Sequence, residues 1–100
     1  MNVVIDDLLI KVNISPHASE RMLERDINHE DILDAILAVG EEMLDCPASK
    51  KIMIRCKEDD QTIICKFDLN DGLELDVITT IDDFKTVNPG HVGLVVWVLW

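Results

Sequence analysis

The chain has 100 residues, of which 20 are acidic and 9 are basic, and its formal net charge is −11. This length fits a single domain over residues 1–100. A surface this negative repels nucleic-acid phosphates at long range, so RNA binding would need a local basic pocket. The longest apolar run, at residues 92–100, is shorter than the roughly 20 residues of a membrane-spanning helix, so we expect no membrane segment.

The N-terminal segment, residues 2–12, is mostly apolar and fits either a strand or a short helix, of which we expect the helix. It contains Asp6 and Asp7 and has neither the basic start nor the cleavage site of a secretion signal. The chain has an odd number of cysteines, without metal-ligand spacing. We therefore expect a reducing cytoplasmic location, with the cysteines as small core residues.

Two helices are predicted next. Ser15 can cap free backbone donors and Pro16 is tolerated at a first helical position, so the first helix is expected from Pro16 to Arg25. Asn28 and Asp31 have the spacing of a reciprocal capping box, which starts the second helix. Gly40 can adopt the left-handed conformation that ends it.

After Gly40 the apolar period changes to two residues, which indicates strands. The four predicted strands are EEMLDC (41–46), KKIMIRCK (50–57), QTIICKF (61–67) and LELDVITTI (73–81). The alternation places Thr79 with the apolar side chains of the last strand and Thr80 on the opposite face. Polar stretches between the strands fit hairpin turns. We predict an α+β fold, with N-terminal helices packed on one face of an antiparallel four-stranded meander.

The C-terminal part is predicted as a loop, residues 83–91, followed by an apolar tail, residues 92–100. The tail offers more apolar surface than a monomer normally exposes. We expect it to pair at a sheet edge and to pack against a second copy, giving a homodimer. The predicted interface consists of Val92, Leu94, Val96, Trp97 and Trp100. The alternative is that the tail folds back onto its own sheet or N-terminal segment.

A basic stripe is conspicuous in this acidic chain. In HASERMLERDI, residues 17–27, the helical spacing places His17, Arg21 and Arg25 within about 80° of one another. The structural interpretation is that the arginines form exposed ion pairs with neighbouring glutamates, and that Arg25 ties the helix to strand carbonyls.

The functional interpretation of the same stripe is a phosphate site. A His can transfer a proton near neutral pH, and Arg offers a planar fork of donors to a phosphate. RNA cleavage without a metal needs proton transfer at the 2′-hydroxyl and positive charge on the transition state. One His and two Arg are a minimal set for that chemistry.

The stripe, followed by EDILDAI and later by DVITTID, resembles the bacterial domain-of-unknown-function 4258 family over about residues 14–82. That family is similar to small toxins of the RelE and BrnT type, several of which cut RNA without a metal. The resemblance implies a RelE-like fold, with His17 as the proton-transfer residue and Arg21 as a phosphate ligand. Arg25 would either bind phosphate or brace the helix. The resemblance also implies that Thr79 or Thr80 forms a hydrogen bond with the substrate.

Arg55 and Lys66 are further substrate-binding candidates if the sheet face opposite the main apolar one forms the groove. No metal and no other cofactor is expected, because no two of the three histidines have ligand spacing. Two functions remain open. The stripe favours a toxin-type, metal-independent endoribonuclease acting on RNA. The charge favours a non-enzymatic acidic binder, such as an antitoxin, immunity protein or inhibitor, that occupies a basic partner surface.

Overall fold

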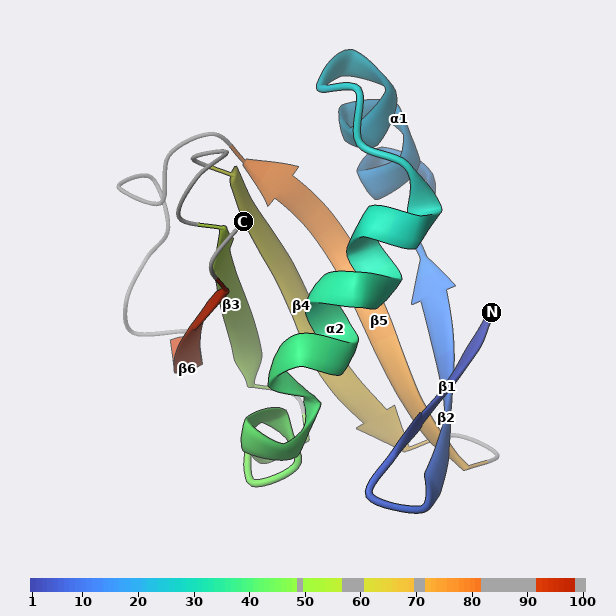
Figure 1. Ribbon diagram of the computed structural model, residues 1–100, viewed down its shortest axis with the longest axis vertical. Coiled ribbons are helices and arrows are strands. Elements are labelled where there is room, and N and C mark those ends of the chain that lie inside the picture. The colour runs from blue at the N-terminus through green and yellow to red at the C-terminus, as the bar shows by residue number, and fades with distance from the viewer. Residues whose placement is uncertain (49, 57–60, 70–71, 82–91, 99–100) are drawn as a thin grey trace.

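The computed structural model describes residues 1–48, 50–56, 61–69, 72–81 and 92–98 (Figure 1). These residues form one mixed six-stranded sheet with two helices on one of its faces. The elements in chain order are β1 (Asn2–Ile5), β2 (Leu8–Ile14), α1 (Pro16–Glu24), α2 (His29–Met43), β3 (Lys51–Cys56), β4 (Gln61–Leu69), β5 (Leu73–Ile81) and β6 (Val92–Val98).

The strand order across the sheet is β1-β2-β5-β4-β3-β6. β3, β4 and β5 form a three-stranded antiparallel meander, which keeps three of the four strands that the sequence predicted. β2 joins the meander in parallel with β5, and β6 joins it in parallel with β3. The predicted RelE-like fold, a four-stranded antiparallel sheet after N-terminal helices, is therefore wrong. Parallel neighbours are distant in sequence, and a pattern of local alternation does not report them.

The N-terminal segment is a hairpin and not the expected helix. Asp6 and Asp7 connect β1 to β2 with φ of 50° and 64°, and Ile5 pairs with Leu8 across them. Two consecutive left-handed residues make the tight turn whose twist matches a hairpin, and Asp tolerates that conformation. The signal in the sequence was this pair of acids between two apolar runs.

Both helix starts are confirmed. The Ser15 hydroxyl accepts a hydrogen bond from the Ala18 N–H at 3.0 Å, and Pro16 occupies the first turn. Asn28 and Asp31 form the full reciprocal box. These starts depend only on neighbours three residues away, which is why the sequence predicted them.

The end of α2 differs from the prediction. The helix continues past Gly40 to Met43, so the expected first strand, EEMLDC, does not exist. Gly40 is buried against Ile5 of β1, and a Cβ added there would lie 2.8 Å from the Ile5 Cδ1. The glycine therefore permits a close helix–hairpin approach and does not end the helix.

The core lies between the helices and the sheet. Ile32, Ile36 and Met43 of α2 are fully buried, as are Ile52, Ile54 and Leu75 of the sheet. Leu37 of the same helix is exposed. Neither helix in the described part of the chain has the length and apolar character needed to cross a bilayer.

The apolar tail adds β6 to the sheet beside β3, as the fold-back alternative had it. Val96 is buried in the core of its own chain, and Leu94 packs against that core. Dimerisation through the tail stays a prediction. The loop expected at residues 83–91 lies outside the described residues, as does Trp100.

Candidate functional site

The basic stripe lies on α1, which packs across the C-terminal half of β5. The start of the helix is attached through Ser15, whose N–H donates to the Val77 carbonyl at 3.1 Å. The hydroxyl of Ser15 donates to the Ile78 carbonyl at 2.9 Å. The same serine thus caps α1 and fixes it to the strand.

Ile78 is the extra residue of a bulge in β5. On β4, Ile64 pairs with Thr79, and the next residue, Cys65, pairs with Val77. The bulge reverses the alternation of side chains after it. Thr80, and not Thr79, therefore faces the helices, and Thr80 is fully buried. The sequence pattern placed the two threonines on the wrong faces because an added residue in a strand is set by pairing and leaves no local signal.

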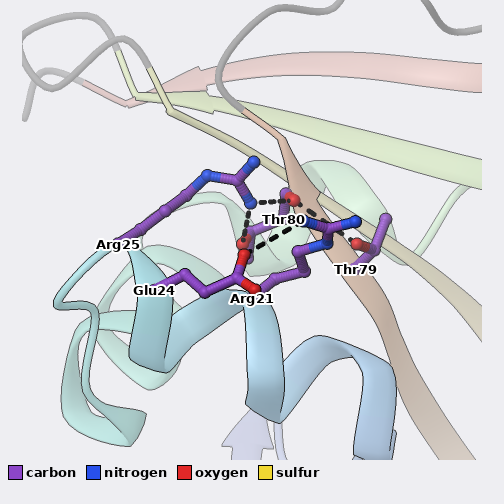
Figure 2. A network of polar contacts seen from close by, with 5 residues as sticks. All are labelled: Arg21, Glu24, Arg25, Thr79 and Thr80. Carbon is purple, nitrogen blue, oxygen red and sulfur yellow. Dashed lines mark hydrogen bonds and ion pairs between the residues drawn. The ribbon is translucent and has the colours of Figure 1, made fainter.

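Arg25 at the end of α1 is bound to this strand (Figure 2). Its guanidinium donates to the main-chain carbonyl of Thr80 and to the Thr80 hydroxyl, the latter at 3.0 Å. Thr79 lies beside it and donates from its hydroxyl to the same carbonyl at 3.3 Å. Arg25 therefore ties α1 to a strand carbonyl, as the structural interpretation of the stripe stated.

The other two members of the stripe are closer to solvent. Arg21 forms an ion pair with Glu24 at 3.0 Å, and 43% of its side chain is exposed. Figure 2 shows its guanidinium extending from α1 toward Thr79. His17, one turn before Arg21 on the same helix, is exposed. The helix thus presents one His and one Arg to solvent and uses the second Arg internally.

The hollow nearest to Arg25 has the wrong charge for a phosphate. It has a volume of about 340 Å³ and is lined by Arg25 together with Asp26 and Asp31, above an apolar floor that includes Ile32 and Ile63. Two carboxylates beside one guanidinium repel an anion more than the guanidinium attracts it. This hollow therefore gives no support to an RNA site.

Arg55 and Lys66 lie on the opposite face of the sheet. Their neighbours Ile54 and Cys65 point into the core, and successive side chains of a strand alternate between faces. Arg55 donates to the Thr62 hydroxyl at 2.8 Å, and Lys66 pairs across the sheet with Asp76. The structure does not bring these two residues together with the stripe on α1.

The most pronounced electrostatic feature is the acidity of α2 and its flanks. Residues 26–49 contain no Lys or Arg and seven acids, which are Asp26, Glu30, Asp31, Asp34, Glu41, Glu42 and Asp45. In the described part of the chain the ion pairs join Lys11 to Glu74 and Arg21 to Glu24, and none involves this segment. We define Glu30, Asp34, Glu41, Glu42 and Asp45, all exposed, as the acidic surface of α2. The sequence carried the signal for this surface as a run without basic residues.

The position of two of these acids is costly to the helix. Glu41 and Glu42 lie in the last turn of α2, which contains no basic residue. The C-terminus of a helix carries partial negative charge, so an acid there is unfavourable by about 0.3–1 kcal/mol. No ion pair within the described chain involves Glu41 or Glu42.

The cysteines are inert core residues, as predicted. Cys46, Cys56 and Cys65 are buried thiols that are not joined in a disulfide. Burial raises the pKa of the Cys65 thiol from its ordinary 9.0 to about 12, with a smaller contribution from Cys46. No group of three His, Cys, Asp or Glu side chains within the described ranges is arranged to hold a metal ion.

Comparison with known proteins agrees with the resemblance of the motifs. The sequence pattern of the family described as Domain of unknown function (DUF4258) matches residues 14–82. No curated protein and no solved structure matches the chain. The matched range contains both helices, the central meander and the contacts that fix α1 to β5, whereas β1 and β6 lie outside it. Since the match spans well over half of the chain, the protein belongs to the DUF4258 family.

Proposed function

We propose that this domain is a non-enzymatic protein-binding module whose acidic surface of α2 occupies a basic surface on a partner protein. The observation that carries the proposal is that this surface has no basic residue and no ion pair in the described chain. Charge held against the helix dipole lowers stability, and a basic partner would supply the missing counter-charge. An antitoxin, an immunity protein or an inhibitor would bind a basic partner protein in this way.

A partner bound in this way should associate quickly at low salt and more slowly as salt rises. The test is a capture from cells of the source organism followed by identification of the protein and measurement of its affinity. The variant Asp34→Asn, Glu41→Gln, Glu42→Gln removes three charges from the acidic surface of α2. We expect it to weaken binding by at least about tenfold, mostly through the association rate.

The matched control is Asp6→Asn, Asp7→Asn, Glu20→Gln. It changes the net charge by the same amount on exposed residues outside α2, so it should weaken binding far less. Equal losses in the two variants would mean that net charge alone acts, and the proposal for α2 would be wrong. Capture of nucleic acid alone would contradict a protein partner altogether.

A second function, metal-independent RNA cleavage, is favoured by a separate observation: His17 is exposed, and Arg21, one turn later on α1, has 43% of its side chain exposed. In this proposal His17 takes the proton of the 2′-hydroxyl, whose oxygen bonds the phosphorus as the bond to the 5′-oxygen breaks. The products are a 2′,3′-cyclic phosphate and a 5′-hydroxyl, which takes its proton from water, and Arg21 stabilises the negative charge of the transition state. Thr79 would bond the substrate, whereas Arg25 and Thr80 would hold α1 in place.

The test is RNA cleavage, or growth arrest on expression, by His17→Ala and Arg21→Ala proteins that remain folded. Glu20→Ala serves as the control because it alters the same exposed helix without touching the stripe. Loss of activity in both variants but not in the control would support cleavage. Full activity in both would remove the two residues from the mechanism.

A further inference from the structure

The outer edge of the sheet at β1 combines a free backbone with exposed apolar side chains. β1 is the terminal strand of the sheet order and pairs with β2 alone in the described chain. Val4 is 59% exposed, and its cross-strand partner Leu9 is 67% exposed. Such an edge is a template for pairing with another strand, and soluble proteins usually protect it with charge or a covering segment.

The hydrogen bonds of the hairpin show which backbone groups of β1 point outward. Met1 and Val12 exchange both of their backbone bonds. Bonded and non-bonded pairs alternate along an antiparallel ladder. The backbones of Val3 and Ile10 are therefore hydrogen-bonded to each other, whereas those of the Asn2–Lys11 and Val4–Leu9 pairs are not. The N–H and C=O groups of Asn2 and Val4 thus face away from β2.

We propose that β1 pairs with β1 of a second copy of this chain, antiparallel and centred on Val3. In this register Asn2 of each copy lies opposite Val4 of the other, so the seam contains two equivalent Asn2–Val4 pairs. All four outward donors and acceptors of each strand are then bonded, and two six-stranded sheets become one continuous sheet. The pairing is isologous, so it closes as a dimer and does not propagate.

The side chains of the open face are compatible with this register. Val4 of one copy lies diagonally across the new seam from Val4 of the other, within reach for apolar contact. The antiparallel direction places the acidic turns at Asp6 and Asp7 at opposite ends of the seam, where they do not face each other.

The occupant is a second copy because the outward backbone groups of β1 pair completely with those of the same strand running in the opposite direction, and because Val4 then meets Val4 across the seam. This surface does not include α2, so the proposal does not depend on the acidic surface or its partner.

The test measures mass in solution at high micromolar concentration, by light scattering after gel filtration. The parent protein is expected to be a dimer and Val4→Lys a monomer, because two lysines would meet diagonally across the seam. Leu23→Lys is the control, since it adds the same charge at an exposed apolar side chain of α1, and it should remain a dimer.

A rescue variant tests the register itself. Asn2→Asp added to Val4→Lys places an aspartate opposite each lysine of the other copy, so the double variant should be a dimer again. Failure of this rescue would overturn the register. A monomeric parent would overturn the dimer. A Val4→Lys protein that is still a dimer would place the interface elsewhere, such as the C-terminal tail, and would also overturn the proposal.

A second measurement uses the parent protein alone and needs no variant to fold. The amide hydrogens of Asn2 and Val4 should exchange slowly at high concentration and quickly after dilution, whereas that of Val3, bonded within the hairpin, should change much less. Fast exchange of Asn2 and Val4 at all concentrations would contradict the pairing.

Discussion

At the scale of single residues, Arg25 explains why a helical stripe of cations need not be a binding site. Its guanidinium bonds a carbonyl and a hydroxyl of the fully buried Thr80. A buried acceptor left without its partner costs the full desolvation of that group. The contacts of Arg25 with Thr80 are therefore sufficient to explain an arginine at this position, and no role in RNA binding is needed.

Replacing Arg25 should accordingly destabilise the protein. We expect Arg25→Met to lower the free energy of unfolding by about 2–3 kcal/mol and Thr80→Val by about 1 kcal/mol. The double variant should lose less than the sum, because both changes remove the same bond. Urea unfolding measures all three. His17→Ala, at an exposed position, should change stability by less than about 0.5 kcal/mol. Additive losses would show that Arg25 acts elsewhere.

The buried thiol of Cys65 predicts a pH dependence of stability. Its pKa is raised from 9.0 to about 12, so the folded state keeps its proton while the unfolded chain loses it above pH 9. This stabilisation is complete below pH 9 and is lost as the pH rises toward 12. At about pH 10.5 we expect a loss of about 2 kcal/mol. Unfolding of Cys65→Ala over the same range isolates the effect, because all other titrating groups are shared.

At the scale of elements, the contact between α2 and the β1–β2 hairpin determines how the N-terminal segment folds. Gly40 lies within the helix, where glycine is a poor choice by about 1 kcal/mol relative to alanine. The close approach of the Ile5 side chain requires it. An element outside the family match is thus attached through a helical position inside it.

The contact predicts that the effect of Gly40→Ala on stability changes sign when Ile5 is replaced by alanine. In the parent protein Gly40→Ala should destabilise by about 1 kcal/mol or more, because overpacking of the Ile5 side chain exceeds the gain in helix propensity. In an Ile5→Ala background the obstructing atoms are gone, and the same substitution should stabilise. Thermal unfolding of the four proteins measures both effects. Destabilisation of equal size in both backgrounds would mean that Ile5 is not the obstacle.

At the scale of the whole molecule, charge is distributed unevenly between the two sides. Residues 26–49 carry seven acids and no Lys or Arg. Lys51, Arg55 and Lys66 lie on β3 and β4, at positions that alternate with the core side chains. A net charge of −11 makes the folded state repel itself, which screening by salt relieves.

Added salt should therefore raise the unfolding temperature, with most of the gain complete once the Debye length falls to about 10 Å near 0.1 M. The variant Asp34→Asn, Glu41→Gln, Glu42→Gln should be more stable than the parent at low salt and should respond less to salt. This increase in stability, together with the loss of partner binding, would identify the acids as functional. An unfolding temperature that is independent of salt would contradict the self-repulsion.

The sequence by itself determined the features that depend on near neighbours. The cap at Ser15, the box of Asn28 and Asp31, and the central meander all follow from residues a few positions apart, because capping bonds and strand alternation are local. The motifs of residues 14–82 identified the family for the same reason. The turn at Asp6 and Asp7 has an equally local signal, a pair of acids between two apolar runs.

Only the tertiary structure decided how distant segments meet. The parallel pairings of β2 with β5 and of β6 with β3 join segments far apart in the chain, and no periodicity encodes a distant neighbour. The bulge at Ile78 determines which threonine faces Arg25, and the approach of Ile5 determines the role of Gly40. In each case the environment of a residue depends on atoms that folding brings near it from elsewhere in the chain. The neighbouring sequence would be the same whether or not those atoms were there.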